Sequence, residues 1–299
     1  MEVPFLRDDL LLPDTIPTIE TIRSAESIFS GKEKSALRRV VAVGKHFLVK
    51  YGRIQPSEAQ NLLFLERHLP EIPAPRLFAL WEEPGPFNEF HTDPYLVMVM
   101  ELFEGESLDH QWPHLSLQDK SIIFSKLKVV FDTLRDLPSS GRYCSVSGGP
   151  MPHYLFFSRP EDSDINGPFN SGYQFITALA KKSRANWQEN QEFSCLADFY
   201  ERNFSPALQH HPSVLTHSDV QRKNIVVQKT KTGETTTDWK VGLVDWEACG
   251  WYPAYWEYFA AFLAFSWNKD DWPIQVERFL QPYGPEAAML KMMYQDLFW

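Results

Sequence analysis

The feature that most constrains the fold is a polar stretch that separates short strands in the second half of the chain. Asp219 and Asn224 follow a short apolar run, and a second run begins directly after them. A turn-rich excursion over 229–238 then leads into a third run, which ends at Asp245. Short runs of β-branched and apolar residues bounded by turn residues predict strands. The order therefore predicts two polar loops beside short strands, joined by a hairpin-like excursion.

The first polar loop has the form His217-x-Asp219-x-x-x-x-Asn224. An aspartate within hydrogen-bond reach of a hydroxyl can orient that hydroxyl and accept its proton during phosphoryl transfer. The asparagine can offer a neutral oxygen to Mg²⁺, an ion that favours oxygen ligands, while the histidine braces the loop. Asp245, at the end of the later strand, lies where a second ligand, a carboxylate, is expected.

Each piece taken alone has an ordinary alternative. Asp and Asn also favour polar loops that close with an Asx-turn, and such loops need no catalytic role. The two pieces occur here in order, each beside a short β-branched strand, and this combination favours the phosphoryl-transfer interpretation.

The first third of the chain predicts strands and one helix. Two apolar runs over 39–50 flank Gly44, which indicates a hairpin. Ser57 and Gln60 form a capping-box pattern that predicts the start of a helix. This helix is expected to run to about Leu69, where a proline stops it.

A carboxylate lies on the apolar face of that predicted helix. At 100° per residue, Leu62, Leu65 and Leu69 fall within about 40° of Glu58. A carboxylate on an inward face is costly unless it is paired, and Lys50 at the end of the preceding strand is the natural partner. The alternative is that Glu58 merely supports the helix start through the helix dipole.

The remaining pattern predicts two unequal lobes. Residues 77–81 and 95–103 indicate further strands, whereas most of the later sequence has helical spacing. A Gly/Pro/Ser-rich region over 139–172 is long enough to be a functional loop. We therefore predict an α+β fold with a β-rich N-lobe over 1–103 and a larger, mostly helical C-lobe over 104–299.

Composition narrows the classes of partner. The formal net charge is −10, so the surface repels nucleic acid and anionic membranes, and neither is expected as a partner. No apolar run approaches 18 residues and no leader pattern is visible, which favours a cytoplasmic setting. The cysteines are too widely spaced for a zinc site or a disulfide framework: Cys144, Cys195 and Cys249.

Tryptophan and tyrosine are concentrated directly after Asp245, over 246–258. Large aromatic side chains dominate protein cores, so core packing behind Asp245 is the favoured interpretation. The alternative is an aromatic substrate pocket.

Taken together, these segments resemble the aminoglycoside phosphotransferase/choline kinase-like family, particularly its fungal branch. The resemblance covers about residues 37 to 265, and the ordered set is more specific for the fold than for the substrate. The matching segments are FLVKYG (47–52), SEA (57–59), VMVME (97–101), EGESL (104–108), GPF (167–169), LTHSD (215–219), NI (224–225), LVDWE (243–247), GWYP (250–253) and YWEY (255–258).

The resemblance implies a protein-kinase-like fold with ATP between the lobes. It places the phosphates of ATP at Lys50, which Glu58 would orient, and assigns the role of catalytic base to Asp219. It also implies that Asn224 and Asp245 hold Mg²⁺. Adenine would pack against a hinge through backbone groups of Met100, Glu101, Leu102 and Phe103.

The sequence departs from the family pattern in three places. The family usually has Gly where this chain has Ser218, and often His where it has Gln221. No glycine-rich phosphate loop is visible, and Ser30-Gly31-Lys32 is a poor substitute for one.

The function implied is that of a phosphotransferase with an alcohol group as acceptor, acting on a metabolite or on an aminoglycoside-like or choline-like compound. The expected partner is this small hydroxyl substrate, and the expected state is a monomer or weak dimer. The alternative is a nucleotide-binding or scaffold protein on the same fold that has little or no activity, which the missing glycine-rich loop and Ser218 favour.

Overall fold

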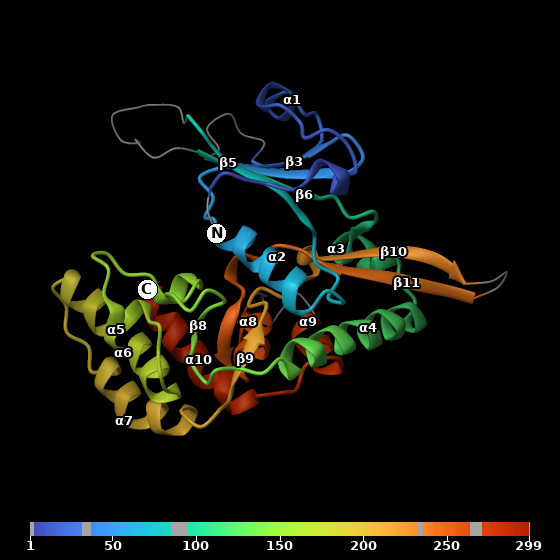
Figure 1. Ribbon diagram of the computed structural model, residues 1–299. Coiled ribbons are helices and arrows are strands. Elements are labelled where there is room, and N and C mark those ends of the chain that lie inside the picture. Colours follow the sequence, from blue (N-terminus) through green and yellow to red (C-terminus); the bar gives the residue numbers. More distant parts are fainter. Residues whose placement is uncertain (1–2, 32–36, 85–94, 233–235, 264–270, 299) are drawn as a thin grey trace.

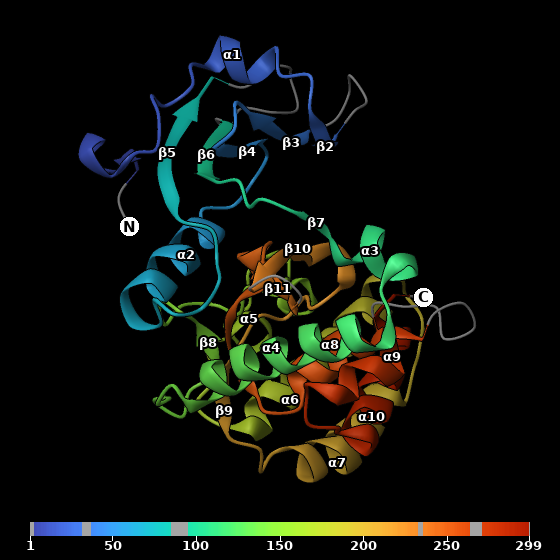
Figure 2. The ribbon, with the colours of Figure 1, turned by 90° about the vertical axis from the view of Figure 1, so that its right-hand side faces the viewer.

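The computed structural model describes residues 3–31, 37–84, 95–232, 236–263 and 271–298 (Figure 1). A β-sheet forms the N-terminal part, and a larger, mostly helical part follows it. Figures 1 and 2 show α2 (Ser57–His68) between the two parts. The predicted α+β class is therefore confirmed.

The N-terminal sheet has six antiparallel strands in the order β1-β5-β6-β4-β3-β2. The hairpin expected around Gly44 is present between β3 and β4, where this glycine has a φ of 63°. The strands are β1 Phe5–Leu6, β2 Ile28–Ser30, β3 Arg38–Val43, β4 Phe47–Gly52, β5 Leu77–Glu83 and β6 Tyr95–Glu101.

The two faces of this sheet have different neighbours. Val41 and Val49 point to the outer face, where they pack with Ile22 of the short helix α1 (Ile19–Arg23) in a small apolar cluster. Side chains alternate between the faces of a strand, so Val40 and Lys50 share the inner face. This inner face is directed toward α2 and the helical part, which places Lys50 in the cleft between the lobes.

α2 forms where the apolar periodicity predicted it, but the capping-box prediction is wrong. The helix already includes Ser57 as its first residue, with Pro56 at the cap position and no side-chain cap. A hydroxyl inside the first turn cannot play the part of a cap outside it. The inward face is as expected, since Glu58, Leu62 and Leu65 are buried.

The helical part contains two small sheets that carry the polar loops. One has the order β11-β10-β7 and the other has the order β8-β12-β9. Their strands are β7 Glu106–Ser107, β8 Cys144–Ser145, β9 Ser213–Thr216, β10 Ile225–Thr232, β11 Thr236–Leu243 and β12 Gly250–Pro253. The predicted hairpin-like excursion is the β10–β11 ribbon, and it joins the Asp219 loop to the Asp245 turn.

Most of the helices pack around the β8-β12-β9 sheet, and α4 runs beside the outward-extending β10–β11 ribbon (Figure 1). The one predicted near Ser116 begins with a complete capping box between Ser116 and Asp119. The helices are α3 Leu108–Gln111, α4 Leu117–Asp136, α5 Ser163–Asn166, α6 Gly172–Glu189, α7 Leu196–Leu208, α8 Trp256–Leu263, α9 Trp272–Gln275 and α10 Gly284–Leu297. Among the described residues, no helix has the length and apolar character needed to cross a membrane.

The aromatic residues that follow Asp245 form core rather than an open pocket. Trp246, Tyr252, Tyr255 and Trp256 are each 0% exposed. The rings of Tyr252 and Trp256 stack with their centroids 5.1 Å apart. The favoured interpretation of this cluster is therefore confirmed, and the turn that bears Asp245 lies on a rigid aromatic floor.

Candidate active site

Lys50 and Glu58 form a buried ion pair at the inner face of the sheet. Lys50 Nζ lies 2.7 Å from Oε1 and 2.8 Å from Oε2 of Glu58, and both residues are less than 5% exposed. Such a pair persists because each charge satisfies the other where water cannot reach. The pairing expected from the helix face is therefore present, and it positions the ammonium group of Lys50 in the cleft.

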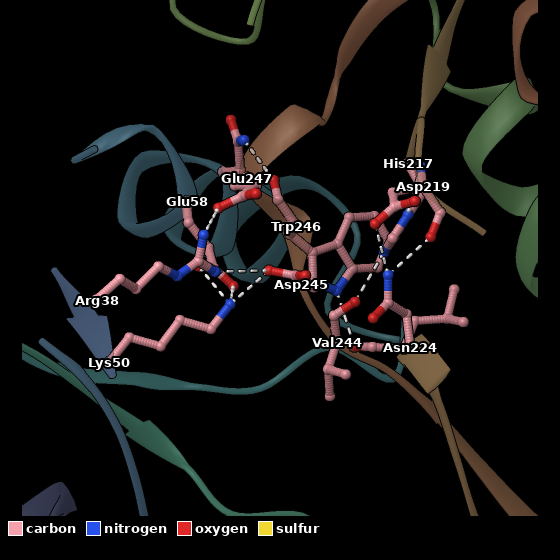
Figure 3. A network of polar contacts seen from close by, with 12 residues as sticks. Arg38, Lys50, Glu58, His217, Asp219, Asn224, Val244, Asp245, Trp246 and Glu247 are labelled. Carbon is pink, nitrogen blue, oxygen red and sulfur yellow. Dashed lines mark hydrogen bonds and ion pairs between the residues drawn. The ribbon is translucent and has the colours of Figure 1, made fainter. Parts of the chain in front are cut away.

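Asp245 completes a trio with these two residues. Its Oδ1 lies 2.6 Å from Lys50 Nζ (Figure 3). Burial opposes the charge on Asp245, but Lys50 and the nearby guanidinium of Arg38 offset it and keep the pKa of this carboxyl low. Burial likewise opposes the charge on Lys50, and its two carboxylate partners raise its pKa. Both groups are therefore held in their charged forms.

The backbone of Asp245 is in the left-handed region, with φ 66° and ψ 57°. Few residues other than glycine adopt this conformation, although Asp tolerates it better than most, and it is often found at functional sites. Here it turns the chain from β11 into the short 3₁₀ turn Trp246–Ala248. The carboxylate is thereby directed toward the cleft and Lys50 (Figure 3).

Asp219 lies on the loop between β9 and the 3₁₀ turn Arg222–Asn224. Its Oδ2 accepts a hydrogen bond of 2.8 Å from Asn224 Nδ2, and Gln221 Nε2 donates to its Oδ1. Asn224 Nδ2 also donates to the Asp219 carbonyl at 2.9 Å. These contacts fix the orientation of the Asp219 carboxylate without neutralising its charge.

Glu257 supports this loop through its carboxylate, although no sequence pattern predicted a role for it. Its carboxylate accepts backbone N–H bonds from His217 at 2.7 Å and from Ser218 at 3.0 Å. Glu257 is 2% exposed, and burial raises its pKa. The only available signal was that it is the one charged residue in an aromatic and apolar run over 250–263.

Ser218, where glycine was expected, has a φ of 72°. A left-handed backbone explains why glycine would suit this position. The Ser218 hydroxyl accepts a hydrogen bond of 2.8 Å from Trp256 Nε1. The serine therefore makes a contact with the aromatic floor that a glycine could not make.

Three hydrogen bonds tie the Asp219 loop, the Asp245 turn and α2 together. His217 Nε2 lies 3.0 Å from the Val244 carbonyl, and Val244 N donates to the Asn224 carbonyl at 3.0 Å. Asn61, on α2, donates to the Trp246 carbonyl at 2.7 Å in a buried position. The candidate residues from both lobes therefore belong to one connected network (Figure 3).

The donor set of this network suits a hard cation such as Mg²⁺. Glu58, Asp245 and Glu247 each offer a carboxylate oxygen, and these oxygens lie within 4.8 Å of one another. Asn224 donates through its nitrogen, which leaves its amide oxygen as a further ligand. Asn224 and Asp245 point in different directions, toward Asp219 and Lys50 respectively (Figure 3). The structure therefore places both expected ligands in the cleft without bringing their side chains together.

The expected hinge, over 100–103, includes the last two residues of β6 and the two residues that follow it. Met100 is buried, and the N–H groups of Glu101 and Leu102 donate at 2.9 Å to the carbonyls of Arg76 and His46. Phe103 packs on β11, where a Cβ on Gly242 would lie 2.5 Å from its ring. Two N–H groups of the hinge therefore already donate hydrogen bonds within the chain. Adenine would have to bind through other backbone groups of this segment.

A cavity of about 1100 Å³ lies against the hinge, and the candidate residues of the cleft do not line it. Its walls come from residues 10–13, the segment over 70–78, the hinge and the β10–β11 ribbon. Lys50, Asp219 and Asp245 do not line it. These three candidate residues therefore lie in the network between the lobes and not in the wall of this cavity.

His153 is buried in the helical part of the protein, next to Trp256 of the aromatic floor. Its ring packs edge-on against Trp256, with centroids 5.2 Å apart, and its Nδ1 accepts a hydrogen bond of 3.3 Å from Leu155 N. Burial, with a smaller contribution from Lys182, lowers the pKa of His153 from 6.5 to about 3. The imidazole is therefore neutral in the folded protein.

Lowering the pH from about 7.5 to about 5 is expected to reduce the free energy of unfolding by about 2 kcal/mol through His153 alone. The unfolded chain binds this proton more readily than the folded chain does. The contribution is complete above the unfolded pKa of 6.5 and is lost as the pH falls toward 3. Urea unfolding at several pH values would measure it, with His153→Asn as the comparison, because Asn keeps an acceptor for Leu155. An equal pH dependence in both proteins would contradict the prediction.

Comparison with known proteins agrees with this geometry. The sequence pattern of the phosphotransferase enzyme family matches residues 30–293. A search among curated proteins finds no relative of this chain. Solved structures do match, at sequence identities that show the fold alone.

The streptomycin–ATP ternary complex of APH(2")-IIa is 16% identical, with a TM-score of 0.55, and the match covers 94% of this chain and 85% of that one. The aminoglycoside phosphotransferase APH(2'')-Ib with ADP bound is 14% identical, with a TM-score of 0.56 and coverages of 91% and 85%. The apo form of a thermostable mutant of the aminoglycoside phosphotransferase APH(4)-Ia is 18% identical, with a TM-score of 0.57 and coverages of 94% and 90%. The predicted kinase-like fold is confirmed.

Proposed function

Because the chain belongs to the phosphotransferase enzyme family, we propose that it is an ATP-dependent small-molecule kinase that phosphorylates a hydroxyl group. The observation that carries this proposal is the continuous network from Lys50 and Glu58 through Asp245 to the Asp219 loop. In this network the ammonium group of Lys50, the carboxylate of Asp245 and the candidate base Asp219 lie around one cleft. Phosphoryl transfer needs these three parts together.

Asp219 is the proposed catalytic base. Gln221 and Asn224 each donate a hydrogen bond to its carboxylate. The carboxylate can still accept one more hydrogen bond, from the hydroxyl group of the substrate. The attacking oxygen would transfer its proton to Asp219 as it bonds to the γ-phosphorus, and the β-phosphate oxygen would leave with ADP. Glu257 and Trp256 keep the loop in place during this step.

Lys50 is the proposed ligand of the ATP phosphates, with Glu58 fixing its position. Asn224 and Asp245 would hold Mg²⁺, and the oxygen donors present fit that ion. The bound ion would neutralise charge on the β- and γ-phosphates. Adenine would rest against the hinge over 100–103, where the chain changes lobes.

The acceptor would approach Asp219 from the helical part. Tyr154, on the 3₁₀ turn Tyr154–Phe156, is 54% exposed and packs edge-on against Phe298. Burial of its hydroxyl, a hydrogen bond to Tyr294 and, least, the charge of Asp219 raise the pKa of Tyr154. An aminoglycoside-like or choline-like compound, or another hydroxylated metabolite, is the proposed class of acceptor.

Two measurements test the proposed function. Thermal shift with Mg·ATP is expected to stabilise the wild-type chain and not the Asp245→Ala variant. ADP release in a panel of hydroxylated amines and other hydroxylated metabolites is then expected to rise above the rate without acceptor for at least one class. Stabilisation by Mg·ATP without any such rise would favour the alternative, a nucleotide-binding protein that transfers nothing.

A further inference from the structure

Arg38 lies in the cleft, and no sequence pattern predicted it as a site residue. It is the first residue of β3 and is directly opposite Gly52 on β4. Val40, two residues later, is opposite Lys50, so Arg38, Val40 and Lys50 project from the same face of the sheet. Because Gly52 has no side chain, the Arg38 side chain can cross the inner face toward the Asp245 turn.

The guanidinium of Arg38 is held by two carboxylates of that turn. Nη1 lies 2.8 Å from Glu247 Oε2, whereas Nη2 lies 3.4 Å from Asp245 Oδ1 (Figure 3). Burial opposes the charge, but Glu247 and Asp245 offset it and raise the pKa of Arg38. The shorter contact makes Glu247 the residue that positions Arg38, and the contact to Asp245 is the weaker one.

Lys50 and Arg38 differ in the number of N–H donors that they can offer to a ligand. Lys50 makes three contacts, to both oxygens of Glu58 and to Asp245, and an ammonium group has three hydrogens to donate. A guanidinium carries five N–H donors in a planar fork, which suits phosphate oxygens. The Arg38 side chain is also 34% exposed, compared with 6% for Lys50. Arg38 is therefore the cation of this network that is accessible from the cleft.

We propose that Arg38 binds the γ-phosphate of the nucleotide, with Glu247 as its positioning residue. The phosphate oxygen would take the place of Asp245 at Nη2, while Nη1 stays on Glu247. Arg38 would thereby supply, from a side chain at the start of β3, the contact to the γ-phosphate that a glycine-rich loop makes with backbone N–H groups. This inference rests on the proposed function, because it assumes that ATP occupies the cleft.

Calorimetric titration of the full chain with Mg·ATP and with Mg·ADP distinguishes a contact to the γ-phosphate from a general effect on nucleotide binding, because ADP has no γ-phosphate. The Arg38→Ala variant is expected to raise the Kd for Mg·ATP by about ten- to hundredfold, the range of one charged hydrogen bond, and to change the Kd for Mg·ADP less than about threefold. Arg38→Lys is expected to restore part of the loss. Glu247→Gln is expected to raise the Kd for Mg·ATP by a smaller factor, again with little effect on Mg·ADP.

Arg53→Ala is the matched control, since this exposed arginine directly follows β4 and its side chain is expected on the outer face. It is expected to leave both Kd values unchanged. If Arg38→Ala raised the Kd values for Mg·ATP and Mg·ADP by the same factor, or raised neither, the inference about Arg38 would be overturned. The proposed function would not be affected. If the wild-type chain binds neither nucleotide, the proposed function fails and the inference fails with it.

Discussion

Replacing Asp219 by Asn is expected to lower kcat by about a thousandfold, while the Kd for Mg·ATP changes less than about threefold. An amide has the shape of the carboxylate but cannot accept the proton of the attacking hydroxyl. Lys50, the proposed ligand of the phosphates, contacts Glu58 and Asp245 directly and not Asp219, so its position should not change in the variant. ADP release with an acceptor found in the panel gives kcat, and calorimetry gives the Kd.

The control for this variant is Asp164→Asn on the surface helix α5, which also removes one negative charge. Asp164 pairs with Lys181 at the surface and has no contact with the candidate site. It is expected to leave kcat unchanged. If the Asp219→Asn variant kept wild-type kcat, the assignment of Asp219 as catalytic base would be refuted.

Replacing Lys50 by Met is expected to abolish Mg·ATP binding and to destabilise the fold by about 3–5 kcal/mol. The loss of stability follows because Glu58 and Asp245 would remain in the cleft without the cation between them. Calorimetry would measure the binding, and urea unfolding would measure the stability.

A double variant separates these two effects. Lys50→Met with Glu58→Leu removes the buried carboxylate together with its cation, so much of the lost stability is expected to return. Mg·ATP binding is not expected to return, since the phosphate ligand is still missing. If the double variant bound Mg·ATP like the wild type, Lys50 would not be a ligand of the phosphates.

The part of the site that the sequence predicted depends on local periodicity. Glu58 was found because it repeats with Leu62 and Leu65 on one face of a helix, and Lys50 because it ends the adjacent strand. Both signals lie within about four helical turns of chain, where the spacing of residues determines which side chains meet. The helix cap was predicted wrongly because a Ser-x-x-Gln pattern does not say whether the chain enters the helix before or at the serine.

The part that the sequence did not predict depends on contacts between distant segments. Arg38 meets Glu247 across 209 positions, and Glu257 supports the Asp219 loop from 40 positions away. No periodicity connects such residues, because the topology of the whole chain brings them together. β2 was missed for a different reason: a strand of three residues is too short to show an alternating pattern.

The hydrogen bond from Asn61 to the Trp246 carbonyl has a consequence for how the protein moves. It is buried and joins α2 to the Asp245 turn, and the Lys50–Asp245 contact runs beside it. Separating the two would leave a buried amide and a buried carbonyl without partners, at a cost of about 1–3 kcal/mol for each group. α2 and the turn are therefore expected to travel as one rigid body. A spin-label pair across α2 and the turn is expected to keep a constant separation when Mg·ATP is added.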